Sequence, residues 1–159
     1  MHYLVSLIVE AEDKEAALSE ARTIADNLIE WQEFDWYNES PEDNRWENCW
    51  NPIPAASDEA KIILKEAVAG QFEEFKRHLE VIRIMLGGYT DEQIFNEEFT
   101  RDPDGPYLSR YHFSAASGVH ANTCQLFGPG GEHIASQRDL NYYLDKPDNL
   151  WIVQVDFHN

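Results

Sequence analysis

Four of the five tryptophans lie between residues 31 and 50, in a stretch that also holds a single arginine. Two runs within it, Asp35-Trp36-Tyr37 and Asn44-Arg45-Trp46, place flat rings beside a guanidinium group. Tryptophan, tyrosine and arginine dominate binding hot spots, and an arginine among carboxylates is expected to form an ion pair, stack on a ring or hold an anionic ligand. The sequence therefore predicts a binding site formed by Asp35, Trp36, Tyr37, Arg45, Trp46 and Trp50, with Trp50 as the most exposed ring. The alternative is that the tryptophans cover the sheet or the long helix as part of the core.

A second cluster depends on how the two ends of the chain pair. His2 lies in the first predicted strand, and Asp156 and His158 share one face of the last. If these strands are antiparallel neighbours, two imidazoles and a carboxylate come together, which is a ligand set that divalent metals accept. Histidines at open strand ends more commonly stay in water. We therefore predict no metal and no other cofactor, with these three residues as the only metal candidates.

No motif in the chain specifies a reaction. The Gly128-Pro-Gly-Gly131 run lacks the lysine and the helix start of a phosphate loop and is typical of a hairpin turn. The sequence contains no Gly-x-Ser-x-Gly nucleophile elbow. With thirty acidic residues, no pair of carboxylates can be singled out for acid–base chemistry. The sequence therefore favours a non-catalytic function.

The formal net charge is -18 at pH 7. Residues 10–47 carry thirteen carboxylates against only Lys14, Arg22 and Arg45. Such a field repels nucleic acid and anionic lipid and attracts basic proteins, so we predict a basic protein partner, no direct contact with nucleic acid and no membrane contact. The sequence has no signal-peptide pattern and no apolar run near the ~20 residues of a membrane-spanning helix. These features predict a cytoplasmic protein with free thiols at Cys49 and Cys124.

The elements that would position these residues follow from apolar periodicity. Residues 2–10 and 150–157 alternate as strands, and both are apolar enough for central positions in a sheet. Asp13 caps a predicted helix over 13–30, and Ser57 caps a longer one over 58–86. One apolar stripe of the longer helix is predicted to face the core: Leu64, Val68, Phe72, Phe75, Leu79, Ile82 and Leu86. This helix is longer than a small sheet needs, so it is also where a homo-oligomer would form.

The remaining predicted elements are shorter. Strands are expected over 33–38, 45–50, 107–114 and 119–127, a hairpin returns over 132–136, and helices are expected over 90–99 and 139–144. A strand followed directly by a packing helix opens a β-α-β unit. We therefore predict a single α+β domain over residues 1–159. Its sheet is antiparallel or mixed, in a ferredoxin-like or related split β-α-β arrangement, and two main helices cover it.

The Asp35-Trp36-Tyr37 and Asn44-Arg45-Trp46 runs, with the ending Trp151-Ile-Val-Gln-Val-Asp-Phe-His158, resemble small uncharacterised proteins of bacteriophages and some bacteria. Those proteins carry Asp-Trp-Tyr followed by Gly-Gly-Arg-Trp and end in an aromatic-valine-Asp-His strand. This chain has Asp43 and Asn44 where the glycine pair would stand, so the turn before Arg45 is expected to differ. The resemblance implies an origin in a phage or other mobile element and transfers no activity.

Three classes of function remain open. The leading one is a non-catalytic acidic protein that engages a basic protein partner, as a nucleic-acid mimic or inhibitor from a mobile element. The first alternative is a small enzyme or ligand-binding domain with a pocket near the Trp-rich stretch. The second alternative is an oligomeric structural protein joined through the long helix. A pocket with convergent polar groups would favour the enzyme, whereas a continuous acidic face without a pocket would favour the mimic.

Overall fold

The two longest strands are neighbours at the centre of the sheet. In a computed structural model that describes residues 1–117, 125–145 and 149–159, β1 (His2–Glu10) pairs antiparallel with β5 (Leu150–His158) along its whole length. The register runs from His2 opposite His158 to Glu10 opposite Leu150. The predicted pairing of the two ends of the chain is therefore confirmed, and it brings residue 2 beside residue 158.

Three two-residue strands complete a five-stranded sheet, in which β3 also pairs with β5 and the main order is β2-β5-β1-β4. β2 (Trp36–Tyr37) and β3 (Ile53–Pro54) pair antiparallel with β5, and β4 (Leu126–Phe127) pairs parallel with β1. Because β1 and β2 both run antiparallel to β5, which lies between them, they form a split β-α-β unit with the helix that joins them. The prediction of a single α+β domain with a mixed sheet is confirmed.

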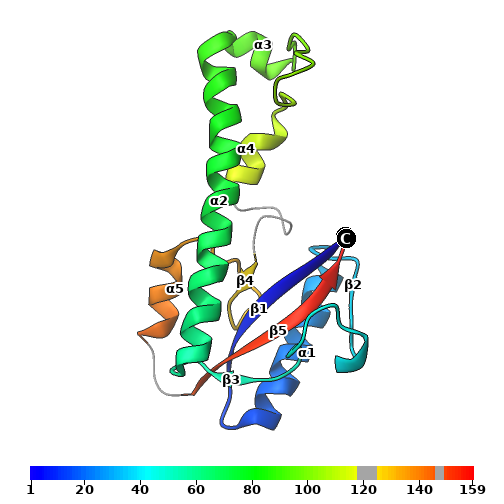
Figure 1. The fold of residues 1–159 in the computed structure, drawn as a ribbon, viewed down its shortest axis with the longest axis vertical. Helices are drawn as coiled ribbons and strands as arrows, with labels where there is room; N and C mark the ends of the chain where they lie inside the picture. The colour runs from blue at the N-terminus through cyan, green and yellow to red at the C-terminus, as the bar shows by residue number, and fades with distance from the viewer. Residues whose placement is uncertain (118–124, 146–148) are drawn as a thin grey trace.

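Helices cover both faces of this sheet (Figure 1). On one face lies α1 (Lys14–Glu30), which begins after Asp13, the predicted cap, whose carboxylate accepts the Ala16 N–H at 2.8 Å. The N-terminal part of α2 (Asp58–Gly88) and α5 (Gln137–Leu144) cover the opposite face. Successive side chains of a strand point to opposite faces. The two central strands therefore supply a separate core on each side.

The core-facing stripe of α2 differs from the predicted one. Its buried residues are Ala60, Leu64, Ala67, Gln71, His78, Val81, Ile82 and Met85. Only two of these belong to the predicted stripe, and Phe72 and Phe75 of that stripe are 55% and 40% exposed. The prediction failed because two polar residues, Gln71 and His78, occupy the buried face, so the apolar pattern does not mark it.

The C-terminal half of α2 extends beyond the sheet and forms an arm with α3 (Asp91–Phe95) and α4 (Tyr111–Ala116) (Figure 1). A small third core around Met85 holds the arm together. α4 lies where residues 107–114 were predicted to form a strand. That prediction is wrong, because this segment packs on α2, away from the sheet edge whose hydrogen bonds a strand needs.

Shorter elements match the sequence predictions unevenly. The hairpin after β4 is confirmed by backbone bonds from Gly128 N to Glu132 O at 2.8 Å and from Ile134 N to Leu126 O at 2.9 Å. The strand predicted over 119–127 lies mostly outside the described residues, and its described end is β4. The helix expected over 90–99 is present only as α3, which is five residues long.

The two strands predicted around the Trp-rich turn are mostly absent. The first is reduced to β2, and residues 45–50 form bends and turns, after a short 3-10 helix, η1 (Pro41–Asp43). Both predicted strands would have to pair with the same free edge of β5. The chain instead pairs with that edge only over two short stretches, β2 at one end of β5 and β3 near the other. None of the described helices is both long and apolar enough to cross a membrane.

Candidate functional site

The Trp-rich segment, residues 31–50, follows the outer edge of β5. Three of its backbone N–H groups donate to carbonyls of that strand: Asp35 to His158 at 2.9 Å, Asn38 to Asp156 at 3.0 Å and Trp50 to Gln154 at 2.9 Å. An open strand edge presents unpaired backbone groups, and this segment covers them. Its side chains are thereby divided between the core and the surface.

Part of the segment belongs to the core. Phe34 and Trp50 are 1% and 5% exposed, and the Phe34 ring stacks on Phe157 with centroids 4.3 Å apart. The indole N–H of Trp50 donates to the Asn38 carbonyl at 2.5 Å, and the Arg22 guanidinium lies 4.9 Å from the centre of the Trp50 ring. The prediction that Trp50 is the most exposed ring is therefore wrong. Its indole finds a backbone acceptor, which allows the whole ring to be buried.

Cys49 lies next to Trp50 and is a free thiol, as predicted; the structure adds that it is buried. Burial, with a smaller contribution from the negative charge of Asp156, raises the pKa of Cys49 to about 11. Because the thiolate is the nucleophile, this thiol is unreactive at neutral pH. Cys124, the other predicted free thiol, lies outside the described residues.

Trp31 and Trp36 are the exposed rings of the segment, at 54% and 43%. The Trp36 ring stacks on His158, with centroids 4.7 Å apart and planes 18° from parallel. The His2 ring meets both edge-on, 6.0 Å from Trp36 and 5.1 Å from His158. Three neighbouring strands thus build an aromatic platform from Trp36, His2 and His158. An exposed ring held in this way can receive a cation or a flat group of a partner.

Asp156 connects the aromatic platform to the Trp-rich segment. It is fully buried, and its carboxylate accepts three hydrogen bonds: Oδ1 from His2 Nδ1 at 2.9 Å, and Oδ2 from Asn38 Nδ2 at 2.8 Å and from the Arg45 N–H at 2.9 Å. Burial alone would raise the pKa of Asp156, but these bonds to the charged form outweigh it and lower that pKa. Asp156 is therefore ionised at neutral pH and fixes the segment to the end of the sheet.

The three predicted metal candidates are neighbours, but one ring nitrogen of each histidine and the Asp156 carboxylate serve other contacts. His2 Nδ1 is bonded to Asp156, and His158 Nε2 lies 3.2 Å from the N-terminal amine of Met1. In the described part of the chain, no group of three or more His, Cys, Asp or Glu side chains is arranged to hold a metal ion. The cluster is a hydrogen-bonded network that supports the platform.

The other predicted binding residues have separate surroundings. The Arg45 side chain is exposed, and its guanidinium lies 5.9 Å from the centre of the Trp46 ring. The Tyr37 hydroxyl donates to Asp26 of α1 at 2.7 Å, and burial followed by this bond raises the pKa of Tyr37. Asp35 is exposed. The structure therefore joins Trp36 to the terminal histidines and leaves the Arg45–Trp46 pair on the surface.

Sequence reasoning missed the hydrogen-bonding residues that order this site. Asn38 both donates to Asp156 and accepts from Trp50. Asp26 reaches Tyr37 from a different element. No motif or periodicity marks such partners; the only available signal was that Asn38 follows the predicted Asp-Trp-Tyr run.

The surface around the Trp-rich segment is strongly acidic. Of the thirteen carboxylates of residues 10–47, twelve are exposed and Glu33 is half-buried. Among the described residues, Glu33 is the only one of them in an ion pair, with His133 at 3.4 Å. The basic residues of this stretch contact an amide or aromatic rings instead of carboxylates: Lys14, Arg22 and Arg45. The negative charge of this surface is therefore not neutralised by the basic residues of the same stretch.

These features define a small acidic α+β protein with a split β-α-β sheet, an aromatic platform at the sheet edge and a projecting helical arm. The chain belongs to the family described as a domain of unknown function, DUF7995, whose model matches residues 1–159. No curated protein and no solved structure matches the chain.

Proposed function

We propose that this is a non-catalytic binding protein whose acidic surface around the Trp-rich segment engages a basic protein partner. The observation that carries the proposal is that twelve carboxylates of residues 10–47 are exposed. The basic side chains of the same stretch contact an amide or aromatic rings and not these carboxylates. Such a field accelerates encounter with positively charged proteins and opposes binding of nucleic acid.

The exposed rings supply the short-range part of recognition. A lysine or arginine of the partner stacked on Trp31 or Trp36 contributes about 0.5–2 kcal/mol, depending on how far water is excluded. Proteins that bind nucleic acid carry such cations on a surface suited to many negative charges. The specific form that we propose is therefore a nucleic-acid mimic or inhibitor, supplied by a phage or other mobile element.

Charge neutralisation tests this proposal. Three acids near the Trp-rich segment are changed to glutamine in the test variant: Glu30, Glu39 and Glu42. Three exposed acids elsewhere are changed in the matched control: Glu66, Glu80 and Glu98. Pull-downs from the source cell are compared at about 50 mM and about 500 mM NaCl, because added salt shortens the range of electrostatic attraction.

We expect the wild type and the control variant to retain basic proteins at low salt and to lose them at high salt. The test variant should lose them at both. Partners held equally by all three proteins at both salt concentrations would rule out electrostatic recognition at this surface.

A homo-oligomer joined through α2 is the second candidate. It is favoured by large apolar side chains that the arm leaves exposed, such as Leu86 and Phe95 at 60% and 71%. Light scattering distinguishes it, since a mass above the 18.4 kDa of one chain is required.

A further inference from the structure

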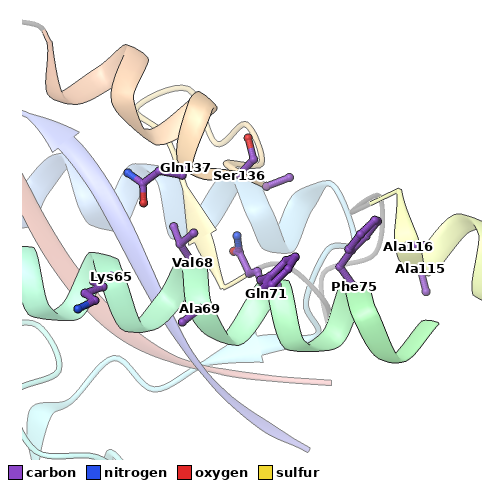
Figure 2. Close-up of a pocket in the computed structure, with 11 residues that line it drawn as sticks. Lys65, Val68, Ala69, Gln71, Phe75, Ala115, Ala116, Ser136 and Gln137 are labelled. Carbon is purple, nitrogen blue, oxygen red and sulfur yellow. The ribbon is translucent and has the colours of Figure 1, made fainter. Parts of the chain in front are cut away.

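A cavity of about 610 Å³ lies between α2, the N-terminal end of α5 and the end of α4. Figure 2 shows its lining side chains, with Lys65 and Gln137 toward one end and Phe75, Ala115 and Ala116 toward the other. Small-molecule sites typically have volumes of about 300–1,000 Å³. The cavity lies on the α2 side of the sheet, away from the α1 side, so it is distinct from the acidic surface described above.

The cavity walls are mainly apolar, and two aromatic rings on them are open to solvent. Phe72 and Phe75 are the half-exposed rings of α2, and they lie 6.5 Å apart with planes 18° from parallel. Burying a phenylalanine side chain contributes about 1.5–3 kcal/mol. Two such rings on one cavity therefore provide a driving force for binding an apolar group.

A buried amide sets the spacing of the walls. Gln71 is 5% exposed; its Nε2 donates to the Ile134 carbonyl at 2.8 Å, and its Oε1 accepts the Gln125 N–H at 2.8 Å. Both bonds tie α2 to the hairpin of β4, which leads into α5. The distance between α2 and the start of α5 is thereby fixed by polar contacts, and the apolar walls are held apart.

One end of the cavity carries a cation that the described residues do not neutralise. Lys65 is exposed and takes part in none of the ion pairs of the described chain. The helix positions one turn away carry no acid: Lys61, Ile62, Val68 and Ala69. At the other end, Lys76 lies 5.0 Å from the centre of the Phe72 ring but is paired with Glu73 at 2.7 Å. An anion entering the cavity is therefore attracted to the Lys65 end.

We propose that this cavity binds a small amphiphile with one anionic head group and an alkyl chain, such as a medium-chain carboxylate. The head group lies at Lys65, and the chain follows α2 past Val68 and Phe72 toward Phe75. Ten residues of helix separate the two ends, a distance of about 15 Å at 1.5 Å per residue. Lys65 selects the charge of the ligand, and the two rings select its apolar part.

Isothermal titration calorimetry with decanoate, kept below its micelle-forming concentration, tests this proposal on the full chain. Ala69→Trp places a ring in the cavity from an exposed helix position, and Lys65→Met removes the cation but keeps an apolar side chain. Lys61→Met is the matched control, because it removes the same charge one turn away, at a residue that does not line the cavity. Decanol serves as the neutral probe of equal chain length.

We expect decanoate to bind the wild type and Lys61→Met equally. Decanoate should bind Lys65→Met about two- to fivefold more weakly than the wild type, as expected for the loss of one solvent-exposed ion pair. Decanol, which has no charge, should bind the wild type about as weakly as decanoate binds Lys65→Met. Ala69→Trp should not bind; circular dichroism checks its fold, and Ala69→Leu is a smaller obstruction if the tryptophan variant does not fold. Absence of decanoate binding to the wild type would overturn the proposal, as would equal binding to the wild type, Lys65→Met and the obstructed variant. Neither result bears on the basic partner.

Discussion

Replacement of Asp156 tests whether the network at the end of β5 holds the Trp-rich segment on the sheet. In Asp156→Ala, the His2 imidazole, the Asn38 amide and the Arg45 N–H lose their common acceptor. Asp156 is fully buried. A buried donor left without an acceptor costs about 1–3 kcal/mol, and three part-buried donors lose their acceptor here. We therefore expect the free energy of unfolding to fall by about 3–5 kcal/mol, among the larger effects of single substitutions.

Asp156→Asn separates the charge from the hydrogen bonds. Its carbonyl oxygen can replace Oδ2 and accept from Asn38 and Arg45, while its amide faces His2, whose neutral ring can present Nδ1 as an acceptor. We expect a smaller loss, of about 1–2 kcal/mol. Asp43→Ala, which removes an exposed acid from the same segment, is the control and should change stability by less than about 0.5 kcal/mol.

Urea unfolding at neutral pH, followed by tryptophan fluorescence, measures these differences. The fold lowers the pKa of Asp156, so its contribution to stability is fully present above the unfolded-state value of about 3.9 and is lost as the pH falls through the lower folded-state value. The gap between the wild type and Asp156→Asn should therefore shrink below about pH 4. If Asp156→Ala were as stable as Asp43→Ala at neutral pH, the proposed role of the network would be refuted.

Two further predictions distinguish surface from core within the Trp-rich segment. Arg45→Ala should change the free energy of unfolding by less than about 1 kcal/mol, because the guanidinium is exposed and its ring contact is with Trp46; a loss of several kcal/mol in urea unfolding would contradict this. Cys49, with its pKa raised to about 11, should resist a thiol reagent in the native protein at mildly alkaline pH and react once the protein is unfolded in urea. Mass spectrometry separates the two cysteines, and rapid native labelling of Cys49 would show that it is not buried.

The central sheet could be predicted because its signal is local. β1 and β5 alternate along their length, and the side chains of each face enter a different core, as Val5 and Ile8 do. The buried face of α2 could not be predicted in the same way. Gln71 is buried because its amide meets Ile134 and Gln125, more than fifty residues away in sequence. Hydrophobic periodicity identifies a buried helix face by its apolar residues. It therefore cannot identify a buried polar residue whose hydrogen-bond partners are distant in sequence.

The candidate site shows the same limit at the level of single rings. Trp36 and Trp50 were predicted to act together, yet one is exposed and the other is core. The difference comes from the backbone: Asn48 and Trp50 have positive φ angles of 67° and 59°, which few non-glycine residues adopt. In this conformation the backbone N–H of Trp50 donates a hydrogen bond to β5, and its indole N–H donates a second one to the Asn38 carbonyl. Residue type alone cannot reveal such a conformation.

The uneven distribution of charge lets the two proposed ligands use opposite faces of one sheet. Residues 10–47 carry thirteen acids against three bases, whereas α2 carries six acids against five bases. The sheet and the side chains packed on it separate these surfaces by about 10 Å or more, which is close to the Debye length at physiological salt. An anionic head group is therefore repelled from the α1 side and tolerated on the α2 side, where Lys65 attracts it. A basic partner has the opposite preference. Neutralising acids near the Trp-rich segment should therefore abolish partner binding and leave decanoate binding unchanged, whereas Lys65→Met should weaken decanoate binding and leave partner binding unchanged.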